Sequence, residues 1–339
     1  MAVRLTDVAN EAGVSLATAS RVLNGSARKP AEEISLKVRQ AAEKLGYFPN
    51  AQAQALARSS TKLVGLIVRD IADPYFSSIA RGVQRGLGES GIQLLLASVG
   101  SDYEREMEAI KAFMSQRTDA IILSGSRLLK GDQQLVQLLE SYQSNGGRAI
   151  MIGQPLALTG GIQIDNQGTA ADLASELVRQ GHRRFAILAG DPKLVTPTHR
   201  ALGFKDKLEL TGIEVEQTLY GAFSREGGYL AMSDYLTARE KQKISGQVCI
   251  FCVSDVMALG ALHAIRERGL RVPEDIALVG FDDIPTLVDV TPSVSTARLP
   301  LEEIGRMAGE MVLGESGAKL VVVSGTPVLR RSSQLAVSG

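Results

Sequence analysis

The most regular pattern in this 339-residue chain begins at Thr61, where short apolar runs alternate with stretches of helical period. The first runs are KLVGLIV, IQLLLASV, DAIIL and RAIMI, and after GIQID the pattern resumes with RFAILAG, VCIFCV and DIALVGF. Apolar strands that alternate with helices are typical of parallel sheets covered on both faces. We expect about ten strands in two such sheets, the first ending near Ile152 and the second starting near Ile164.

The C-terminal segment is predicted to return across both sheets. PSVSTARLP is followed by a helix that ends at Leu313, and then by the runs KLVVV and PVLRR. Ligands of doubly wound sheets bind beyond the carboxyl ends of the strands. Two facing sheets therefore predict a cleft between them.

The N-terminal segment DVANEAGVSLATASRVLNGS (residues 7–26) has a different pattern, which predicts two short helices joined by a tight turn. Gly13 ends the first helix, Ser15 is placed to cap the second, and Asn24-Gly25 ends the second. The apolar stripe of the first helix is Val8, Ala9 and Ala12, and that of the second is Ala19, Val22 and Leu23. Small, hydroxylated and basic residues remain on the outer face of the second helix.

These outward residues suit contact with DNA, because the second helix of a helix-turn-helix lies in the major groove. Arg21 can donate a pair of hydrogen bonds to guanine, and Leu16 or Ala17 can contact a thymine methyl group. The hydroxyl groups available for phosphates or base edges are those of Ser15, Thr18 and Ser20. The alternative is an ordinary helix pair in which Arg21 is a solvated surface charge.

A linker is predicted over residues 47–62, YFPNAQAQALARSSTK, from Pro49 and the Ser-Ser-Thr run. Its alanine-rich middle, AQAQALARS, is prone to form a helix but too short to be stable alone in water. A segment that becomes helical only with help is a candidate switch.

Composition and charge narrow the function classes. The net charge is zero, but the first 60 residues carry eight basic and five acidic side chains, so the excess of positive charge lies on the segment with the helix pair. No apolar run approaches a membrane span and the N-terminus lacks the pattern of a secretory leader, so we expect a soluble, cytoplasmic protein.

The sequence contains three features that could indicate an enzyme, a metal site or a cofactor, and each has a simpler explanation. Cys249 and Cys252 form a C-x-x-C inside an apolar run, which indicates two reduced core cysteines, and three scattered histidines predict no metal site. GLGESG (residues 86–91) matches the dinucleotide fingerprint, yet it closes a helix and precedes a strand, so its glycines are interpreted as a helix end and turn. We expect no cofactor and no catalytic residues.

The segments LTDVANEAGVSLATASRVLNGS and AAEKLGYFPNAQAQALARSSTKLVGLIV closely resemble the lactose-repressor/galactose-repressor (LacI/GalR) family of bacterial transcription regulators. The resemblance continues in order through DPYFSSIARGV, IDNQGTA, QGHRRFAIL, HRALGF, SDVMALGAL, GLRVPEDIALVGFDD and RRSS, and covers essentially the whole chain. It implies an α/β fold with an N-terminal helix-turn-helix DNA-binding domain and a two-lobed, periplasmic-binding-protein-like core of two doubly wound parallel sheets.

The same resemblance sets the expected domain boundaries. The helix-turn-helix domain is expected at residues 1–46, a hinge linker with a DNA-induced helix at 47–61, and the effector-binding and dimerisation core at 62–339. Within the core, the N-subdomain is expected at about 62–162 and 292–325, and the C-subdomain at about 163–291 and 326–339.

On the DNA side, the resemblance implies a homodimer whose subunits each contact half of a pseudo-palindromic operator. Leu56 matches the leucine that is inserted into the minor groove and bends the DNA, although it would also suit an ordinary linker helix. The other residues assigned to DNA are Leu5, Asn24, Tyr47, Asn50 and Ala53.

Two features depart from the family. Leu16 and Ala17 lack hydrogen-bonding groups, which leaves Arg21 as the main polar reader, and the loop NGSARKPAEEIS is one residue longer than usual, which leaves its phosphate contacts unassigned.

In the cleft, Arg200 of HRALGF and Asp282 of GFDD match the positions that hold polar groups of the ligand. A guanidinium donates in a fork and a carboxylate accepts two O–H bonds, which suits vicinal hydroxyls. The matching aromatic walls are Tyr75, Phe76 and Phe223, and weaker candidates at strand ends are Ser124, Thr196, Ser254 and Asp255. Two alternatives stay open. In the first, Arg200 and Asp282 form a buried ion pair that holds the lobes together. In the second, Asp255 caps the helix that follows it.

The sequence therefore predicts a transcription regulator without enzymatic activity, expected to be a repressor, whose partners are operator DNA and a small effector. A monosaccharide or polyol such as a pentose, hexose or inositol is favoured over a purine, because Leu194 stands where the purine-responsive member has a second arginine. The alternatives are a cytoplasmic sugar-binding protein without operator binding, a purine- or nucleoside-responsive regulator, and a nucleotide-dependent enzyme based on GLGESG.

Overall fold

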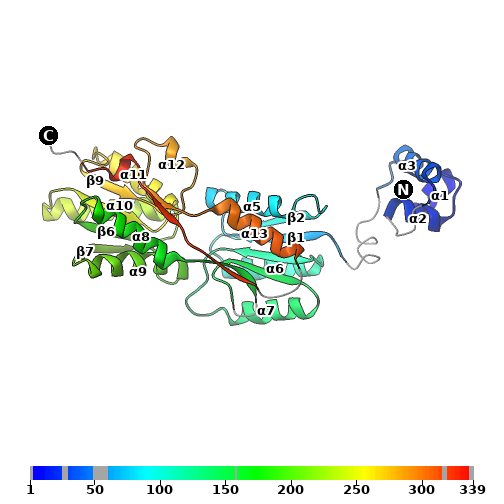
Figure 1. Cartoon of the computed structure of the whole chain (residues 1–339), viewed down its shortest axis with the longest axis horizontal. Coiled ribbons are helices and arrows are strands. Elements are labelled where there is room, and N and C mark those ends of the chain that lie inside the picture. Colours follow the sequence, from blue (N-terminus) through cyan, green and yellow to red (C-terminus); the bar gives the residue numbers. More distant parts are fainter. Residues whose placement is uncertain (1–2, 25–29, 49–59, 157–158, 315–318, 336–339) are drawn as a thin grey trace. The chain divides into compact units, whose positions relative to one another are not determined.

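The computed structural model of the protein describes residues 3–24, 30–48, 60–156, 159–314 and 319–335 (Figure 1). Its internal contacts divide the chain into two compact units. The first unit comprises residues 1–63 with 117–119, and the second comprises 64–116 with 120–339. In the described part of the chain, no helix is long and apolar enough to cross a membrane.

The described residues of the N-terminal unit form three helices, α1 (Leu5–Glu11), α2 (Leu16–Asn24) and α3 (Glu32–Leu45). The Ser15 hydroxyl accepts a hydrogen bond from the Thr18 N–H (3.1 Å), which caps α2 as predicted. Small side chains let the helices meet closely around a core that consists of Val8, Ala9, Ala19, Val38, Ala41 and Ala42. The helix pair of the sequence pattern is therefore completed by a third helix that supplies half of this core.

The first sheet of the core has six strands in the order β11-β5-β4-β3-β1-β2. The strands are β1 (Leu63–Val68), β2 (Gln93–Ser98), β3 (Ala120–Ser124), β4 (Arg148–Gly153), β5 (Gly160–Ile164) and β11 (Leu320–Val323). The helices of this lobe are α5 (Pro74–Leu87), α6 (Tyr103–Ser115), α7 (Gln133–Ser144) and α13 (Leu301–Leu313). Ala120 and Ile122 of β3 pack on the side of α5 and α13, whereas Ile121 and Leu123 pack on the side of α6 and α7. Both faces of the inner strands β1, β3 and β4 are buried, which explains why these strands are mostly apolar.

The second sheet has four parallel strands in the order β7-β6-β8-β9. They are β6 (Phe185–Gly190), β7 (Val215–Tyr220), β8 (Val248–Cys252) and β9 (Ile276–Val279). The helices are α8 (Asn166–Arg179), α9 (Val195–Leu210), α10 (Arg225–Gln242) and α11 (Asp255–Glu267), of which α8 packs against α9 and α10 against α11. Phe204 of α9 stacks on Phe251 of β8 with ring centroids 4.1 Å apart, which fixes that helix on the sheet.

The C-terminal segment connects the two lobes, as the sequence predicted. Its elements are α12 (Thr286–Asp289), β10 (Thr296–Arg298), β12 (Thr326–Val328) and the 3₁₀ helix η1 (Arg331–Ser333), in addition to α13 and β11. β10 pairs antiparallel with β12 and bridges β9 through Ser295, whereas α13 packs on α5 and β11 pairs with β5. The chain therefore changes lobe after β10 and again after β11 (Figure 1).

Most of the predicted pattern is confirmed, with one correction. The two parallel sheets and the helix ending at Leu313 are present, Gly88 of GLGESG caps α5 ahead of β2, and Cys249 and Cys252 are free and buried in β8. The expectation that the second sheet starts near Ile164 is wrong. The run at residues 160–164 is β5, which pairs with β4 in the first sheet because its buried Ile162 and Ile164 complete that core.

The pair of helices α5 and α13 depends on glycine for its close approach. A methyl group at Gly305 would lie 2.1 Å from the carbonyl oxygen of Ile79, and one at Gly82 would lie 2.1 Å from that of Glu302. Backbone atoms cannot retreat as a flexible side chain can, so the two helices would have to separate.

We therefore expect Gly305→Ala to destabilise the core by roughly 1–3 kcal/mol, as overpacking does in well-packed interiors. Gly314, at the end of the same helix, is the matched control, because its nearest neighbour would lie 3.6 Å from an added methyl group. Chemical denaturation of both alanine variants measures the effect. Equal stability of the two variants would contradict the close approach.

Candidate functional site

The exposed face of α2 carries the residues predicted to contact DNA. Ser15, Leu16, Ala17 and Arg21 are exposed, and Leu16 leaves 49% of its surface open to solvent. Within the described residues, the Arg21 guanidinium makes no hydrogen bond or ion pair. A long apolar side chain and an unpaired cation on one short helix contribute little to folding and are available for recognition.

The other predicted DNA-binding residues have mixed positions. Thr18 and Ser20 are half-buried. The Ser20 hydroxyl accepts a hydrogen bond from the Asn24 amide (3.0 Å), so the side chains of Ser20 and Asn24 hold each other in place on α2. Leu5 and Tyr47 are half-buried against the three-helix core. Asn50, Ala53 and Leu56, and with them the predicted linker helix, lie outside the described residues.

The predicted cleft is a cavity of about 740 Å³ lined by both lobes of the core. The first lobe contributes the residues that follow β1 and the start of α5, and the second contributes α9 and the ends of β7, β8 and β9. The carboxyl ends of parallel strands are where such folds bind ligands. The lining includes these predicted residues: Tyr75, Phe76, Thr196, Arg200, Phe223, Ser254 and Asp282.

Arg200 is the most engaged polar side chain of this cleft, with only 2% of its surface exposed. Its Nε donates to the Asn166 side-chain oxygen and its Nη1 to the Val253 carbonyl, both at 2.8 Å. Its Nη2 lies 2.8 Å from Oδ1 of Asp282, and the guanidinium stacks on the Phe281 ring at 4.0 Å from the centroid. The ion-pair alternative is therefore present, but it joins two residues of the second lobe, so it does not hold the lobes together.

Asp282 is held in an unusual backbone conformation that directs it to the cleft. Its φ is +129° and that of Asp283 is +63°, which is costly for residues other than glycine. Ion pairs from Asp283 to Arg298 and Arg330 hold this turn, both at 2.6 Å. Oδ1 of Asp282 lies 2.8 Å from Nη2 of Arg200 but has no aligned hydrogen-bond donor, so this buried acceptor has accepting capacity left.

Burial raises the pKa of Asp282 to about 7, against the opposing effect of the neighbouring Arg200 charge. The negative charge of Asp73, on the other side of the cleft, adds to the increase. Burial also raises the pKa of Asp73 itself. Burial and mutual repulsion therefore both disfavour the ionised forms of these two carboxyl groups.

The aromatic residues form a wall of the cleft. The rings of Tyr75 and Phe76 meet edge to face with their centroids 4.9 Å apart, and Phe76 is buried behind Tyr75. Phe223, from the second lobe, lies under the Arg69 guanidinium, 5.3 Å from its ring centroid to Cζ. This contact joins the two lobes across the cavity.

Two of the weaker candidates lie elsewhere. Asp255 is fully buried and is not part of the cavity lining, because its carboxylate accepts from the Ile284 N–H (2.8 Å) and the Thr296 hydroxyl (2.7 Å). It therefore supports the turn that carries Asp282, and the cap of α11 is its neighbour Ser254. Ser124, at the end of β3, lines a second, smaller cavity of the first lobe.

Three lining residues were missed in the sequence. Asp73 precedes the aromatic pair in DPYF, caps α5 and borders the cleft. Asn166 lies in IDNQGTA and orients Arg200, and Arg69 follows β1. The first two stand in motifs that carry the family resemblance, so those motifs could have shown them, whereas Arg69 had no such pattern. Among the described residues, no three His, Cys, Asp or Glu side chains come together as metal ligands.

Two segments of the chain match models of known protein families. Residues 4–50 match the model of bacterial regulatory proteins of the lacI family, and residues 174–333 match a periplasmic binding protein-like domain. The chain is 32% identical to the HTH-type transcriptional regulator CelR of Thermobifida fusca, with 96% of each chain covered. It is also 32% identical to the HTH-type transcriptional regulator GalR of Escherichia coli K12, covering 91% of this chain and 88% of that protein.

Solved structures agree with these relatives. The lac repressor dimer bound to operator and an anti-inducer has a TM-score of 0.84 at 26% identity, with 99% of this chain and 100% of that chain covered. A complex of the regulator CelR with cellobiose has a TM-score of 0.69 at 29% identity, with 97% and 99% covered.

Replacing Asp282 by asparagine is expected to flatten the pH dependence of stability. In the folded protein this carboxyl group stays protonated up to about pH 7, whereas in the unfolded chain it ionises near its usual value. Between about pH 4 and about pH 7 the folded state therefore binds more protons than the unfolded chain. As a result, the free energy of unfolding falls as the pH rises through this range. Above about pH 7 the protonated Asp282 carboxyl group no longer contributes to the free energy of unfolding.

Urea denaturation at about pH 5 and about pH 8 measures the slope. Burial raises the pKa of Asp255 as well, so Asp282→Asn retains part of the dependence. The exposed Asp289, replaced in the same way, is the control. A wild-type slope in the Asp282 variant would show that this carboxyl group does not stay protonated.

Proposed function

We propose a specific function for this chain, which belongs to the LacI family of bacterial regulatory proteins and is therefore a DNA-binding transcription regulator. In this proposal it binds a pseudo-palindromic operator as a homodimer, and a small sugar or polyol controls the binding. Its relatives are regulators and not enzymes. We expect it to repress transcription in the cytoplasm of its bacterial host.

The observation that carries the effector proposal is the buried acceptor of Asp282. Asp282 lines the cavity together with Tyr75 and with Arg200, whose Nη2 lies 2.8 Å from its Oδ1. A sugar hydroxyl can donate to the carboxylate, and the apolar face of a sugar ring can stack on an aromatic side chain. The complex of CelR with cellobiose supports a sugar as the class of effector.

The domain boundaries of this proposal are a helix-turn-helix domain at residues 1–46, a linker at 47–61 and an effector-binding core at 62–339. The lac repressor dimer on its operator supports the same arrangement here. In this proposal Leu56 is inserted into the minor groove when the linker folds on DNA. Effector binding shifts the population of core conformations and so decides whether both linkers of the dimer fold together.

Arg21 is proposed to read a base rather than a phosphate. Arg21→Ala is then expected to lose about 1–3 kcal/mol on the best operator and to relax the preference at one position of each half-site. Competition binding with a randomised operator library measures both effects. Arg39, an exposed arginine of α3, is the control. Equal weakening on all sequences would assign Arg21 to the phosphate backbone.

Asp282→Asn is expected to keep operator binding and to lose the response to the effector. The amide keeps the shape of the side chain but loses the charge and part of the accepting capacity, so a ligand hydroxyl is left without its partner, at a cost on the order of 1–3 kcal/mol. A thermal-shift screen with sugars, polyols, purine bases and nucleosides first identifies the ligand. Calorimetry on wild type, Asp282→Asn and the Asp289→Asn control then measures the loss. Stabilisation by purines alone, or wild-type sugar affinity in the Asp282 variant, would contradict the proposal.

A further inference from the structure

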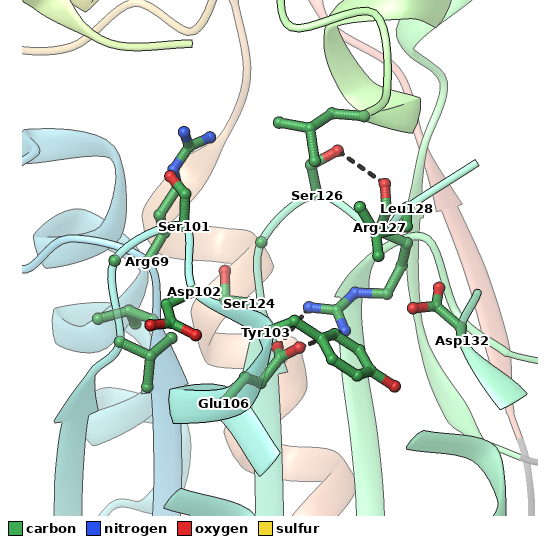
Figure 2. Close-up of a pocket in the computed structure, with 15 residues that line it drawn as sticks. Arg69, Ser101, Asp102, Tyr103, Glu106, Ser124, Ser126, Arg127, Leu128 and Asp132 are labelled. Carbon is green, nitrogen blue, oxygen red and sulfur yellow. Dashed lines mark hydrogen bonds and ion pairs between the residues drawn. The ribbon is translucent and has the colours of Figure 1, made fainter. Parts of the chain in front are cut away.

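The first lobe contains a second cavity, of about 80 Å³, beside the main cleft. We call it the side cavity, and Figure 2 shows its lining. It shares Arg69, Gly100, Ser101, Gly125 and Ser126 with the lining of the main cleft. The two cavities are therefore neighbours that a single ligand can enter.

Unpaired polar atoms gather at these two cavities. In the described part of the chain, the buried side-chain atoms without a hydrogen-bond partner are Oγ of Ser124, Nε of Arg127, Oδ1 of Asp132 and Oδ1 of Asp282. The first three belong to residues of the side cavity and the fourth to a residue of the main cleft. A buried polar atom left without a partner costs about 1–3 kcal/mol, so such a cluster calls for an occupant.

The side cavity is built rigidly. Nη1 and Nη2 of Arg127 donate to the two carboxylate oxygens of Glu106 at 2.9 and 2.5 Å, in a pair that is about nine-tenths buried (Figure 2). The backbone of Arg127 is also fixed, since its N–H donates to the Gln154 side chain (3.1 Å) and its carbonyl accepts from the Val195 N–H (2.9 Å). Its Nε therefore cannot turn toward another protein partner.

The polar groups that line the side cavity determine which kind of ligand can bind there. Nε of Arg127 requires an acceptor, Oδ1 of Asp132 requires a donor, and the Ser124 hydroxyl accepts either. An anion would meet the charges of Glu106 and Asp132, and a cation would meet that of Arg127. A neutral hydroxyl both donates and accepts. One water needs roughly 10–15 Å³ on this measure, so the space holds several hydroxyl groups.

We propose that the side cavity is the second half of the effector site and binds hydroxyl groups of a second sugar unit, so that the effector is a disaccharide or a larger glycoside. This inference rests on the proposed sugar control, and it replaces the single monosaccharide expected from the sequence. The first unit lies against Arg200 and Asp282, and the second reaches Ser124, Arg127 and Asp132.

The test compares each monosaccharide with a disaccharide that contains it, by calorimetry on the full chain. The probe pairs are glucose with cellobiose, glucose with maltose, galactose with lactose, and xylose with xylobiose. One disaccharide is expected to bind roughly tenfold or more tightly than its monosaccharide. Ser124→Ala removes a hydroxyl that has no protein partner, and Asp132→Asn keeps the shape of the side chain but removes its charge and one acceptor oxygen. Both variants are expected to fold, and in each the ratio of the two affinities falls toward one.

Ser115→Ala and Asp234→Asn, at exposed positions outside both cavities, are the matched controls and are expected to keep the wild-type ratio. If monosaccharides bind and no disaccharide binds more tightly, or if Ser124→Ala and Asp132→Asn leave the ratio as in wild type, the side cavity holds water only and this inference is overturned while sugar control stands. If no sugar binds, sugar control itself fails, and this inference fails with it.

Discussion

The buried charge of Arg200 is the constraint on which the ligand-binding core depends. Moving a guanidinium out of water costs several kcal/mol unless hydrogen bonds and an opposite charge compensate for it. Its partners Asn166, Val253 and Asp282 follow β5, β8 and β9, so the ends of strands from both sheets must be in place at once. The Phe281 ring closes the remaining side of the guanidinium. One side of the cleft is thus ordered before any ligand arrives.

The two lobes meet beside this site through a small set of polar contacts. Leu128 and Leu194 form a β-bridge, and the Thr196 N–H donates to the Ser126 hydroxyl at 2.9 Å, while the Thr196 hydroxyl accepts from Gln154 at 2.8 Å. These contacts lie close to the cavities, where a bound ligand would be. A ligand that adds hydrogen bonds on both sides changes the balance between arrangements, which is how binding energy becomes a change of conformation.

The sequence predicted the parts of the structure that depend on local patterns. The apolar runs identified the strands, Gly13 identified the end of α1 and Ser15 the start of α2, because periodicity and capping act over a few residues. The assignment of β5 to the first sheet depends on the packing of Ile162 against distant residues, which no local pattern reports. Arg200 and Asp282 were found from family motifs, but their pairing within one lobe and the side cavity around Arg127 depend on side-chain geometry in three dimensions.

Strand β3 connects the two functional regions of the core. Its C-terminal residue, Ser124, lines the side cavity. Just before its first residue, Asp119 accepts hydrogen bonds from the backbone N–H groups of Thr61 and Lys62 at 2.9 and 3.0 Å and from the Ser60 hydroxyl at 2.6 Å. Ser60 and Thr61 are the last two residues of the linker expected at residues 47–61, and Lys62 follows it. Every residue of β3 is buried and paired with strands on both sides. In the proposed effector control, β3 is therefore a short covalent path from the side cavity to the residue that holds the end of the linker.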